Sequence, residues 1–245
     1  MSDRVVIVTG SSSGIGESLT GVLLERGWTV IGIARRPLER VESTYRHVQH
    51  DLADLASLES ELIPELTRLI SGSPWARVGL VNNAASVGQL TSFDQYSAGP
   101  LLDTMAVNLV APIRLMGLGV SIVEADTPLR IVNVSSGAAV EGFPGIGDYC
   151  ASKAGLRMAG LAMAAEVEAA GARDMGVFSY EPGIVETPMQ EQARGRAKED
   201  FPGFDMFHYF QEANILVQPE AVVAPMADFL EGAGPLGFSE SRYGE

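Results

Sequence analysis

Short apolar runs alternate with longer segments of helical periodicity, and this alternation limits the possible fold more than any other feature. The runs are apolar throughout instead of at every second residue, which is typical of strands covered on both faces of a parallel sheet. We therefore predict an α/β fold, a doubly wound, Rossmann-type parallel sheet between two helical layers. The expected strands are 5–8, 28–34, 45–49, 77–81, 130–134 and 176–180, with a final apolar run at 236–238, and the expected helices are 15–25, 54–70, 101–123, 148–170 and 219–230.

Composition narrows the class of protein. The chain has 245 residues without repeats, low-complexity tracts or a linker-like stretch before residue 186, so we expect a single domain over residues 1–245. The single cysteine, Cys150, excludes an intrachain disulfide and suits a reducing compartment. The three histidines form no cluster with it at metal-ligand spacing, so no metal site is expected.

The charge balance argues against polyanionic partners. The net charge of −14 repels nucleic acid and anionic membrane surfaces. The first residues lead directly into an apolar strand without a secretory signal, and we expect no membrane-spanning run of about 18 apolar residues. The sequence therefore predicts a soluble, cytoplasmic protein that binds neither nucleic acid nor membranes.

A glycine-rich turn joins the first strand to the first helix. Its glycines permit close approach of backbone N–H groups to a pyrophosphate, and the helix N-terminus adds partial positive charge there. The position of the turn favours dinucleotide binding over the alternative of a flexible Gly/Ser loop. The residues expected around the phosphates are Gly10, Ser12, Ser13, Gly14, Ile15 and Gly16.

The glycine spacing, Gly-x-x-x-Gly-x-Gly, resembles that of the short-chain dehydrogenase/reductase family. The end of the second strand then indicates which dinucleotide is bound. An acidic residue there accepts from the ribose 2′-OH of NAD, whereas basic residues accommodate the 2′-phosphate of NADP. This chain has Arg35 and Arg36, and no carboxylate before Glu39. We predict NADP(H), with Arg35 the stronger candidate; a solvated basic turn is the alternative.

The family resemblance implies further cofactor contacts. Asp51 and Leu52 match the position that holds the adenine edge, and residues 82–85 resemble an Asn-Asn-Ala-Gly turn with Ala85 in place of the last glycine. Residues 182–187 fit the turn beside the nicotinamide. The resemblance thus assigns to the cofactor Asp51, Leu52, Asn83, Ala84, Pro182, Gly183, Val185 and Thr187.

Four residues are the predicted catalytic group. Tyr149 and Lys153 are one helical turn apart, so an ammonium would lie near the phenol and lower its pKa by about three units. Ser136 precedes Tyr149 by 13 residues, the spacing of the family, and its hydroxyl can hold a substrate carbonyl. The resemblance implies that Asn108 bonds backbone and holds a water that relays protons; a solvent-facing side chain is the alternative.

Residues 186–214 interrupt the α/β pattern where the family places its substrate lid. Five aromatic residues lie within 201–210. We predict an apolar or aromatic carbonyl substrate in contact with Phe143, Met189, Phe204 and Phe207; a satellite hydrophobic cluster or a subunit contact is the alternative. Residues 186–190 and 213–220 resemble the sepiapterin reductase and benzil reductase branch, which implies NADPH-dependent reduction of ketones or vicinal dicarbonyls. The pterin-anchoring carboxylate of that branch has no counterpart here, so a benzil-like diketone fits better.

Two other functions and one assembly follow from the same residues. A non-catalytic NADP(H)-sensing protein would not need Ser136, Tyr149 and Lys153 together, and an NAD-dependent alcohol dehydrogenase of the same fold is opposed by Arg35.

The helix 148–170 is apolar nearly all round. We therefore expect it to pack both on the sheet and, beside the helix 101–123, on a second copy in a homodimer or homotetramer.

Overall fold

The computed structural model describes residues 3–38, 40–171, 173–233 and 236–244. Within these residues, its centre is a seven-stranded sheet in the order β3-β2-β1-β4-β5-β6-β7, and every neighbouring pair is parallel. The chain fills the sheet outward from β1 in one direction and then crosses to β4, so the predicted doubly wound, Rossmann-type topology is confirmed. The strands are β1 (Arg4–Thr9), β2 (Thr29–Ala34), β3 (Tyr45–Gln49), β4 (Arg77–Asn82), β5 (Leu129–Val134), β6 (Met175–Glu181) and β7 (Gly237–Arg242).

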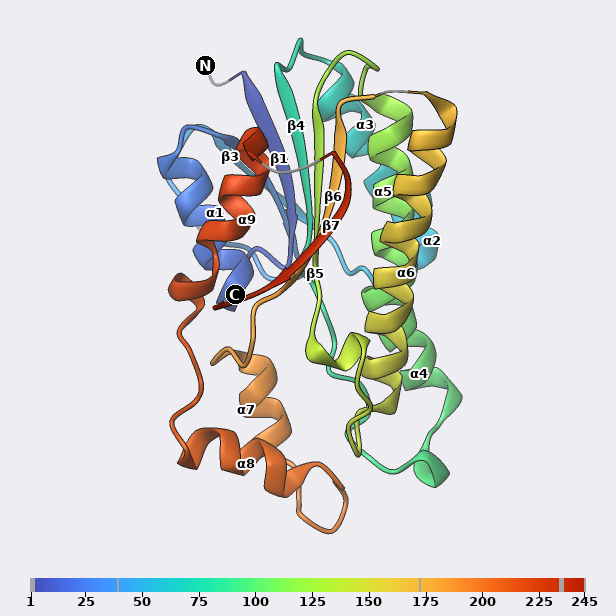
Figure 1. The fold of residues 1–245 in the computed structure, drawn as a ribbon, viewed down its shortest axis with the longest axis vertical. Helices are drawn as coiled ribbons and strands as arrows, with labels where there is room; N and C mark the ends of the chain where they lie inside the picture. The colour runs from blue at the N-terminus through green and yellow to red at the C-terminus, as the bar shows by residue number, and fades with distance from the viewer. Residues whose placement is uncertain (1–2, 39, 172, 234–235, 245) are drawn as a thin grey trace.

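Helices cover both faces of the sheet (Figure 1). One layer holds α1 (Gly14–Glu25) and α9 (Ala224–Asp228), and the other holds α3 (Ile63–Ser71), α5 (Ala111–Ile122) and α6 (Gly147–Ala170). Shorter elements complete the layers and connections: α2 (Leu55–Ser57), η1 (Leu58–Leu62), η2 (Phe93–Gln95), α4 (Ala98–Met105), η3 (Ala106–Val110), η4 (Gly137–Ala139), η5 (Pro219–Val222) and η6 (Phe229–Ala233).

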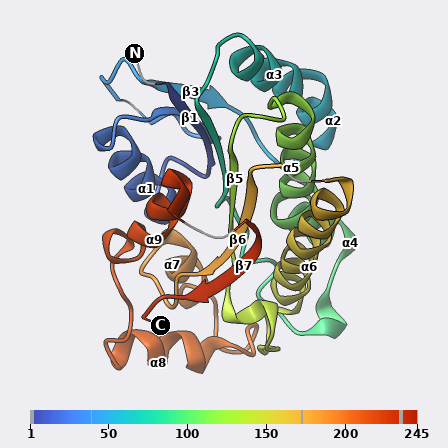
Figure 2. The ribbon, with the colours of Figure 1, turned by 45° about the horizontal axis from the view of Figure 1, so that its top comes forward.

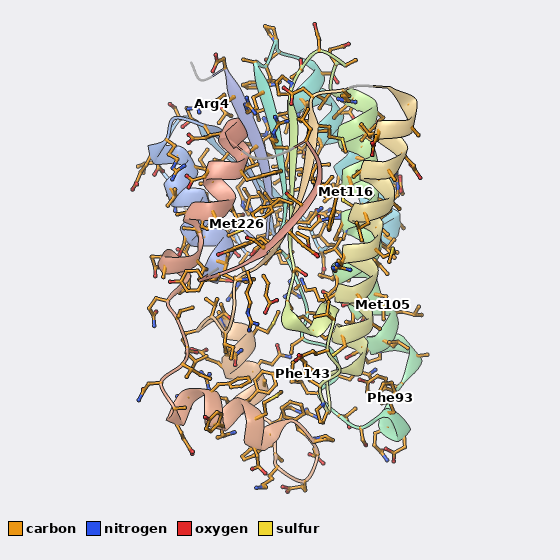
Figure 3. The ribbon with its side chains drawn as sticks, viewed as in Figure 1. Arg4, Phe93, Met105, Met116, Phe143 and Met226 are labelled. Atoms are coloured by element: carbon orange, nitrogen blue, oxygen red, sulfur yellow. The ribbon has the colours of Figure 1, made fainter. Side chains whose placement is uncertain are left out.

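The core has two halves because the central strands are buried on both sides. In β1, Val5 belongs to a cluster that includes Met116 of α5, whereas its neighbour Val6 belongs to a cluster that includes Met226 of α9. Figure 3 shows these two methionines on opposite sides of the sheet. Continuous apolar strands are therefore required here, which is the pattern that predicted the fold.

We expected no apolar run long enough to span a membrane, and the helical run Ala98–Ile122 corrects this expectation. By length and composition it could cross a membrane, since an 18-residue window has a mean hydropathy of 1.6. Its average stays high although Asn108 and Arg114 interrupt the apolar residues. In this fold 39% of that window is buried, and Leu115 packs into the core. Core helices of proteins without membrane spans reach the same length and mean hydropathy.

Residues 186–214, which we call the lid, form two helices where an irregular segment was expected. These are α7 (Pro188–Arg194) and α8 (Phe204–Glu212), and Figures 1 and 2 show α8 beyond the carboxyl ends of the strands. The base of the lid is closed by backbone bonds from Glu186 N to Val217 O and from Val217 N to Ile184 O, both 2.9 Å long. An ion pair of 2.6 Å from Arg194 to Glu186 ties α7 to this base.

Candidate active site

One cavity of about 1150 Å³ runs along the carboxyl ends of the strands and under the lid. At one end it is lined by the glycine turn, at the other by lid side chains such as Phe207, with Tyr149 and Ser136 on its wall. We call this cavity the cleft. Parallel α/β sheets bind their ligands at this edge, so the fold alone makes the cleft the first candidate for a functional site.

The glycine turn leaves no room for larger residues. Gly10 and Gly14 have φ angles of +68° and +55°, in the left-handed region that favours glycine. A Cβ on Gly16 would lie 2.2 Å from the carbonyl oxygen of Gly10, so only a glycine permits this close approach of the helix to the turn. Gly16 itself does not line the cleft; it shapes the turn from behind.

A network around Thr9 fixes the turn against β4. The Thr9 hydroxyl accepts from the backbone N–H groups of Asn83 and Ala84, each at 3.0 Å, and donates to Val81 O at 3.2 Å. The Asn83 amide donates to Thr9 O at 2.9 Å. The Asn83 side chain, which was predicted to contact the cofactor, therefore fixes the shape of the crevice between β1 and β4. Asn83 and Ala84 also line the cleft.

The far end of the cleft is open and basic. Arg35 and Arg36 line it and are exposed, and the structure gives neither guanidinium an ion pair with any described residue. Asp51 lies beside them with its carboxylate accepting from Ala53 N at 3.1 Å. His50, which the sequence did not single out, also lines this end and is only 9% exposed.

Three of the four side chains of the predicted catalytic group converge on the middle of the cleft. Ser136 and Tyr149 line it side by side with Lys153. The Lys153 ammonium lies 5.6 Å from the centre of the Tyr149 ring and donates to Val134 O at 2.7 Å. The helix α6 thus presents both side chains to the same space, as their spacing of one turn requires.

Burial raises the pKa of the Tyr149 phenol, whereas the proximity of the Lys153 ammonium was expected to lower it. The pKa of the Tyr149 phenol is raised by burial to about 12, and a hydrogen bond with the Ser136 side chain opposes that rise. Burial also lowers the pKa of the Lys153 ammonium to about 8. The expectation of a lowered phenol pKa is therefore wrong for the chain without cofactor, because removal from water outweighs the hydrogen bond with Ser136.

Asn108 lies behind the cleft and not in its wall. It is 1% exposed within the π-helical turn η3, a geometry that recurs at functional sites. Its amide donates to Ser86 O at 2.8 Å and to the Ser152 hydroxyl at 3.0 Å, and its oxygen accepts from Ser86 N at 2.7 Å. Ser152 donates in turn to Tyr149 O at 2.7 Å. The residue therefore holds the backbone beneath the phenol, which explains an asparagine inside a helix.

A second buried polar residue, Asp148, was missed by sequence reasoning. It is 2% exposed, and its carboxylate accepts from Gln89 N at 3.0 Å, the Tyr96 hydroxyl at 3.3 Å and the Thr104 hydroxyl at 3.4 Å. These donors come from the 86–97 connection and from α4. The carboxylate thus fixes two segments to the start of α6, one residue before Tyr149. The only signal in the sequence is an acidic residue next to a candidate catalytic one.

The end of β6 and the end of β7 close the cleft on another side. Pro182, Gly183, Val185 and Thr187 line it, as the resemblance implied. Glu181 and Arg242 line it as well and form an ion pair of 3.2 Å. Nothing local in the sequence brings these two together, because the contact depends on pairing of β6 with β7.

The lid and the segment before α6 supply part of the apolar wall. Phe143, Met189 and Phe207 line the cleft, and Figure 3 shows Phe143 between the lid helices and the start of α6. Phe204 is a correction, because it does not line the cleft. Its ring stacks on His208 with the centroids 3.9 Å apart and is covered by the Lys198 ammonium. Met206 and Phe210 of the predicted lid also line the cleft, and sequence reasoning missed Gln190 and Gln192 as parts of this wall.

Metal chemistry has no candidate site in the described part of the chain. No group of three or more His, Cys, Asp or Glu side chains converges among those residues.

Comparison with known proteins places the chain in a family. A model of the short chain dehydrogenase family matches residues 4–198, so the chain belongs to that family, whose members are oxidoreductases that use nicotinamide cofactors. A benzil reductase ((S)-benzoin forming) of Bacillus cereus is 33% identical to it over 236 residues, covering 93% of this chain and 94% of the relative.

Two further matches agree with this assignment. An NADPH-dependent pterin aldehyde reductase of Arabidopsis thaliana is 27% identical over 197 residues, covering 79% of this chain and 80% of the relative. A short chain dehydrogenase/reductase from Saccharomyces cerevisiae has the same fold, with a TM-score of 0.81 at 23% identity, covering 99% and 96% of the two chains. The expected membership in the branch of benzil and pterin reductases is confirmed.

Proposed function

We propose that the chain is an NADPH-dependent carbonyl reductase that converts a ketone or vicinal dicarbonyl, benzil-like or with a pterin side-chain carbonyl, to the hydroxy compound. One observation carries the proposal: Ser136, Tyr149 and Lys153 meet in a single cleft that extends from the glycine turn to an apolar lid. The benzil reductase relative supports the substrate class, and the pterin aldehyde reductase relative supports NADPH.

The residues that line the cleft fit the phosphates, the adenine and the nicotinamide of a dinucleotide. Residues 12–15, at the turn that leads into the N-terminus of α1, line the cleft beside glycines whose missing Cβ atoms leave space for a close approach. Asp51 and Leu52 would hold the adenine, and Pro182, Gly183, Val185 and Thr187 would hold the nicotinamide. The exposed guanidiniums of Arg35 and Arg36 supply charge for a 2′-phosphate in a chain of net charge −14.

A reduced nicotinamide held by these residues would supply the hydride from C4 that the substrate carbonyl carbon accepts. Ser136 donates a hydrogen bond to the carbonyl oxygen and stabilises the negative charge that develops on it. Tyr149 transfers its phenolic proton to that oxygen, which completes the alcohol. A raised phenol pKa keeps this proton in place before substrate arrives. Lys153, with a pKa of about 8, can then return a proton to the phenolate.

The proposal is tested with Tyr149→Phe, which removes the donated proton and keeps the ring. We expect benzil reduction by NADPH to fall at least a hundredfold while NADPH binds with unchanged affinity in a fluorescence titration. Full activity of the variant would refute the mechanism. Failure of the unmodified chain to oxidise NADPH with any of a panel of diketones and quinones would favour the NADP(H)-sensing alternative.

The cofactor preference has its own test. NADPH should bind at least tenfold more tightly than NADH, because the guanidiniums of Arg35 and Arg36 would pair with a 2′-phosphate that NADH lacks. Equal affinities would instead favour an NAD-dependent alcohol dehydrogenase of the same fold.

We also propose cytoplasmic residence and assembly as a homodimer or homotetramer through the helices at 101–123 and 148–170. Large apolar side chains of these helices are exposed in the single chain: Leu102 by 67%, Ile113 by 41% and Met158 by 60%. Large apolar side chains exposed on neighbouring helices support a surface that a partner covers. Light scattering that shows a monomer at micromolar concentration would contradict the assembly.

A further inference from the structure

Arg242 is a charged group of the cleft that the proposed mechanism leaves unused. It lines the cleft from the last position of β7, and 57% of its side chain is exposed. Its Nε atom pairs with Glu181 Oε1 at 3.2 Å. Neither of its two terminal nitrogens donates a hydrogen bond to any residue that the structure describes. The guanidinium therefore has donors left for a ligand that enters the cleft.

Pairing of the last two strands places this guanidinium close to the turn that carries Ser136. Arg242 and Glu181 are partners in the register of β7 with β6. The same carboxylate also approaches the residue after Ser136, because a Cβ on Gly137 would lie 3.2 Å from Glu181 Oε1. The Glu181 carboxylate thus lies between the guanidinium and the Ser136 turn, and Arg242 belongs to the part of the cleft where the substrate is proposed to react.

This guanidinium is also well separated from the basic end of the cleft. Arg35 and Arg36 follow β2, and the strands β1, β4, β5 and β6 lie between β2 and β7 in the sheet. Arg242 is therefore not part of the group proposed for the 2′-phosphate, and its ligand is to be sought in the substrate.

The chemistry of the guanidinium indicates an anionic oxygen as that ligand. A guanidinium is planar and always charged, and the two N–H groups at its terminal edge match the two oxygens of a carboxylate. A partly exposed ion pair contributes little free energy, so Glu181 orients the guanidinium without satisfying its terminal donors. The net charge of −14 and the carboxylate of Glu141, which also lines the cleft, disfavour an anion elsewhere on this wall. An acidic group of a substrate would therefore depend on Arg242.

We infer that Arg242 is a specificity-determining residue that binds a carboxylate carried by the carbonyl substrate. This inference rests on the proposed carbonyl reduction and extends its substrate class from neutral dicarbonyls to aromatic keto acids. The aromatic ring of such a substrate would contact the apolar wall that contains Phe143 and Phe207, while its carboxylate would pair with the guanidinium at the end of β7.

The experiment compares two aromatic keto acids with their methyl esters, which keep the skeleton and remove the charge. Benzoylformate has its carboxylate directly on the ketone carbon, whereas 4-oxo-4-phenylbutanoate has two methylene groups in between, so the pairs test two distances. For each pair, the ratio of kcat/KM for the acid to kcat/KM for the ester is measured with NADPH. Arg242→Gln should lower this ratio about tenfold or more for at least one pair, because the acid alone loses a charged partner. Comparison of the ratio between proteins cancels the intrinsic reactivity of the ketones.

Arg157→Gln is the matched control. Arg157 pairs with Glu240 of the same strand at 2.7 Å but does not line the cleft, so this variant also loses an ion pair to β7 and should preserve the ratio. Arg242→Lys keeps the charge without the planar fork and should lower the ratio less than Arg242→Gln does. The Tm of Arg242→Gln should stay within about 2 °C of that of the unmodified chain, because exposed ion pairs add little stability.

The outcomes separate the inference from the proposed function. An unchanged ratio in Arg242→Gln for both pairs, or an equal fall in Arg157→Gln, would overturn the role of Arg242 while carbonyl reduction stands. Reduction of benzil by the unmodified chain without reduction of either keto acid would have the same meaning. Failure to reduce benzil, the acids and the esters alike would overturn the proposed function and the inference with it.

Discussion

The buried ammonium of Lys153 should make the cofactor-free chain less stable than a variant without it. Lys153 is 3% exposed and its pKa is lowered from 10.5 to about 8, which corresponds to about 3 kcal/mol against the charged form. Lys153→Met removes that cost but leaves Val134 O without its donor, a loss of about 1–3 kcal/mol. We expect the variant to be inactive and, at pH 7, as stable as the unmodified chain or more stable by about 1–2 kcal/mol.

The pH dependence of stability isolates the ammonium. Between pH 8 and 10.5 the folded chain has lost the Lys153 proton while the unfolded chain still holds it. The unfolded state therefore binds more protons, and the free energy of unfolding rises with pH, by about 2 kcal/mol at pH 9.5 relative to pH 7. Lys153→Met should lack this contribution.

Urea unfolding of both proteins at pH 7 and pH 9.5 measures the difference, and contributions of other groups cancel in the comparison. Equal pH slopes for the two proteins, together with a clear loss of stability in Lys153→Met at pH 7, would refute the reasoning. That result would mean that the ammonium is well paired and that its burial carries no cost.

Two further predictions concern residues around the cleft. Gly16→Ala should weaken NADPH binding at least tenfold in a fluorescence titration, because the new Cβ would lie 2.2 Å from the carbonyl oxygen of Gly10. The control is Gly21→Ala in the same helix, which should bind NADPH normally because its Cβ would meet an Arg40 nitrogen at 3.5 Å. Equal affinities of the two variants would show that the turn shifts freely. Asp148→Ala should lower the free energy of unfolding by about 3 kcal/mol and reduce kcat, because Gln89 N, the Tyr96 hydroxyl and Tyr149 N lose their acceptor; a fully active variant of normal stability in urea would contradict the positioning role.

The fold was predictable because the strands that carry it are buried on both faces. Their runs of Val, Ile and Leu leave little doubt about a parallel sheet. The last strand was only partly predicted, as the run 236–238, because β7 at the sheet edge has the polar sequence GFSESR and is defined by pairing with β6. The lid helices were missed for a related reason. Aromatic residues packed on one another define α8, and local propensity does not.

The candidate site was predictable where it depends on spacing along the chain. The glycine turn, and the pair Tyr149 and Lys153, each lie within one local element whose geometry the spacing determines. Contacts between distant segments were out of reach, as the pairing of Glu181 with Arg242 shows. The pKa of Tyr149 was predicted in the wrong direction because depth below the surface cannot be read from the neighbouring residue types.

The two ends of the described chain lie at opposite ends of the parallel strands, which matters when the protein is attached to a surface. Arg242 lines the cleft at the carboxyl end of β7, whereas Arg4 begins β1 at the amino end of the strands (Figure 1). A bulky tag or an immobilising linker joined after β7 would emerge beside the entrance used by ligands. The same attachment placed before β1 would leave that entrance clear.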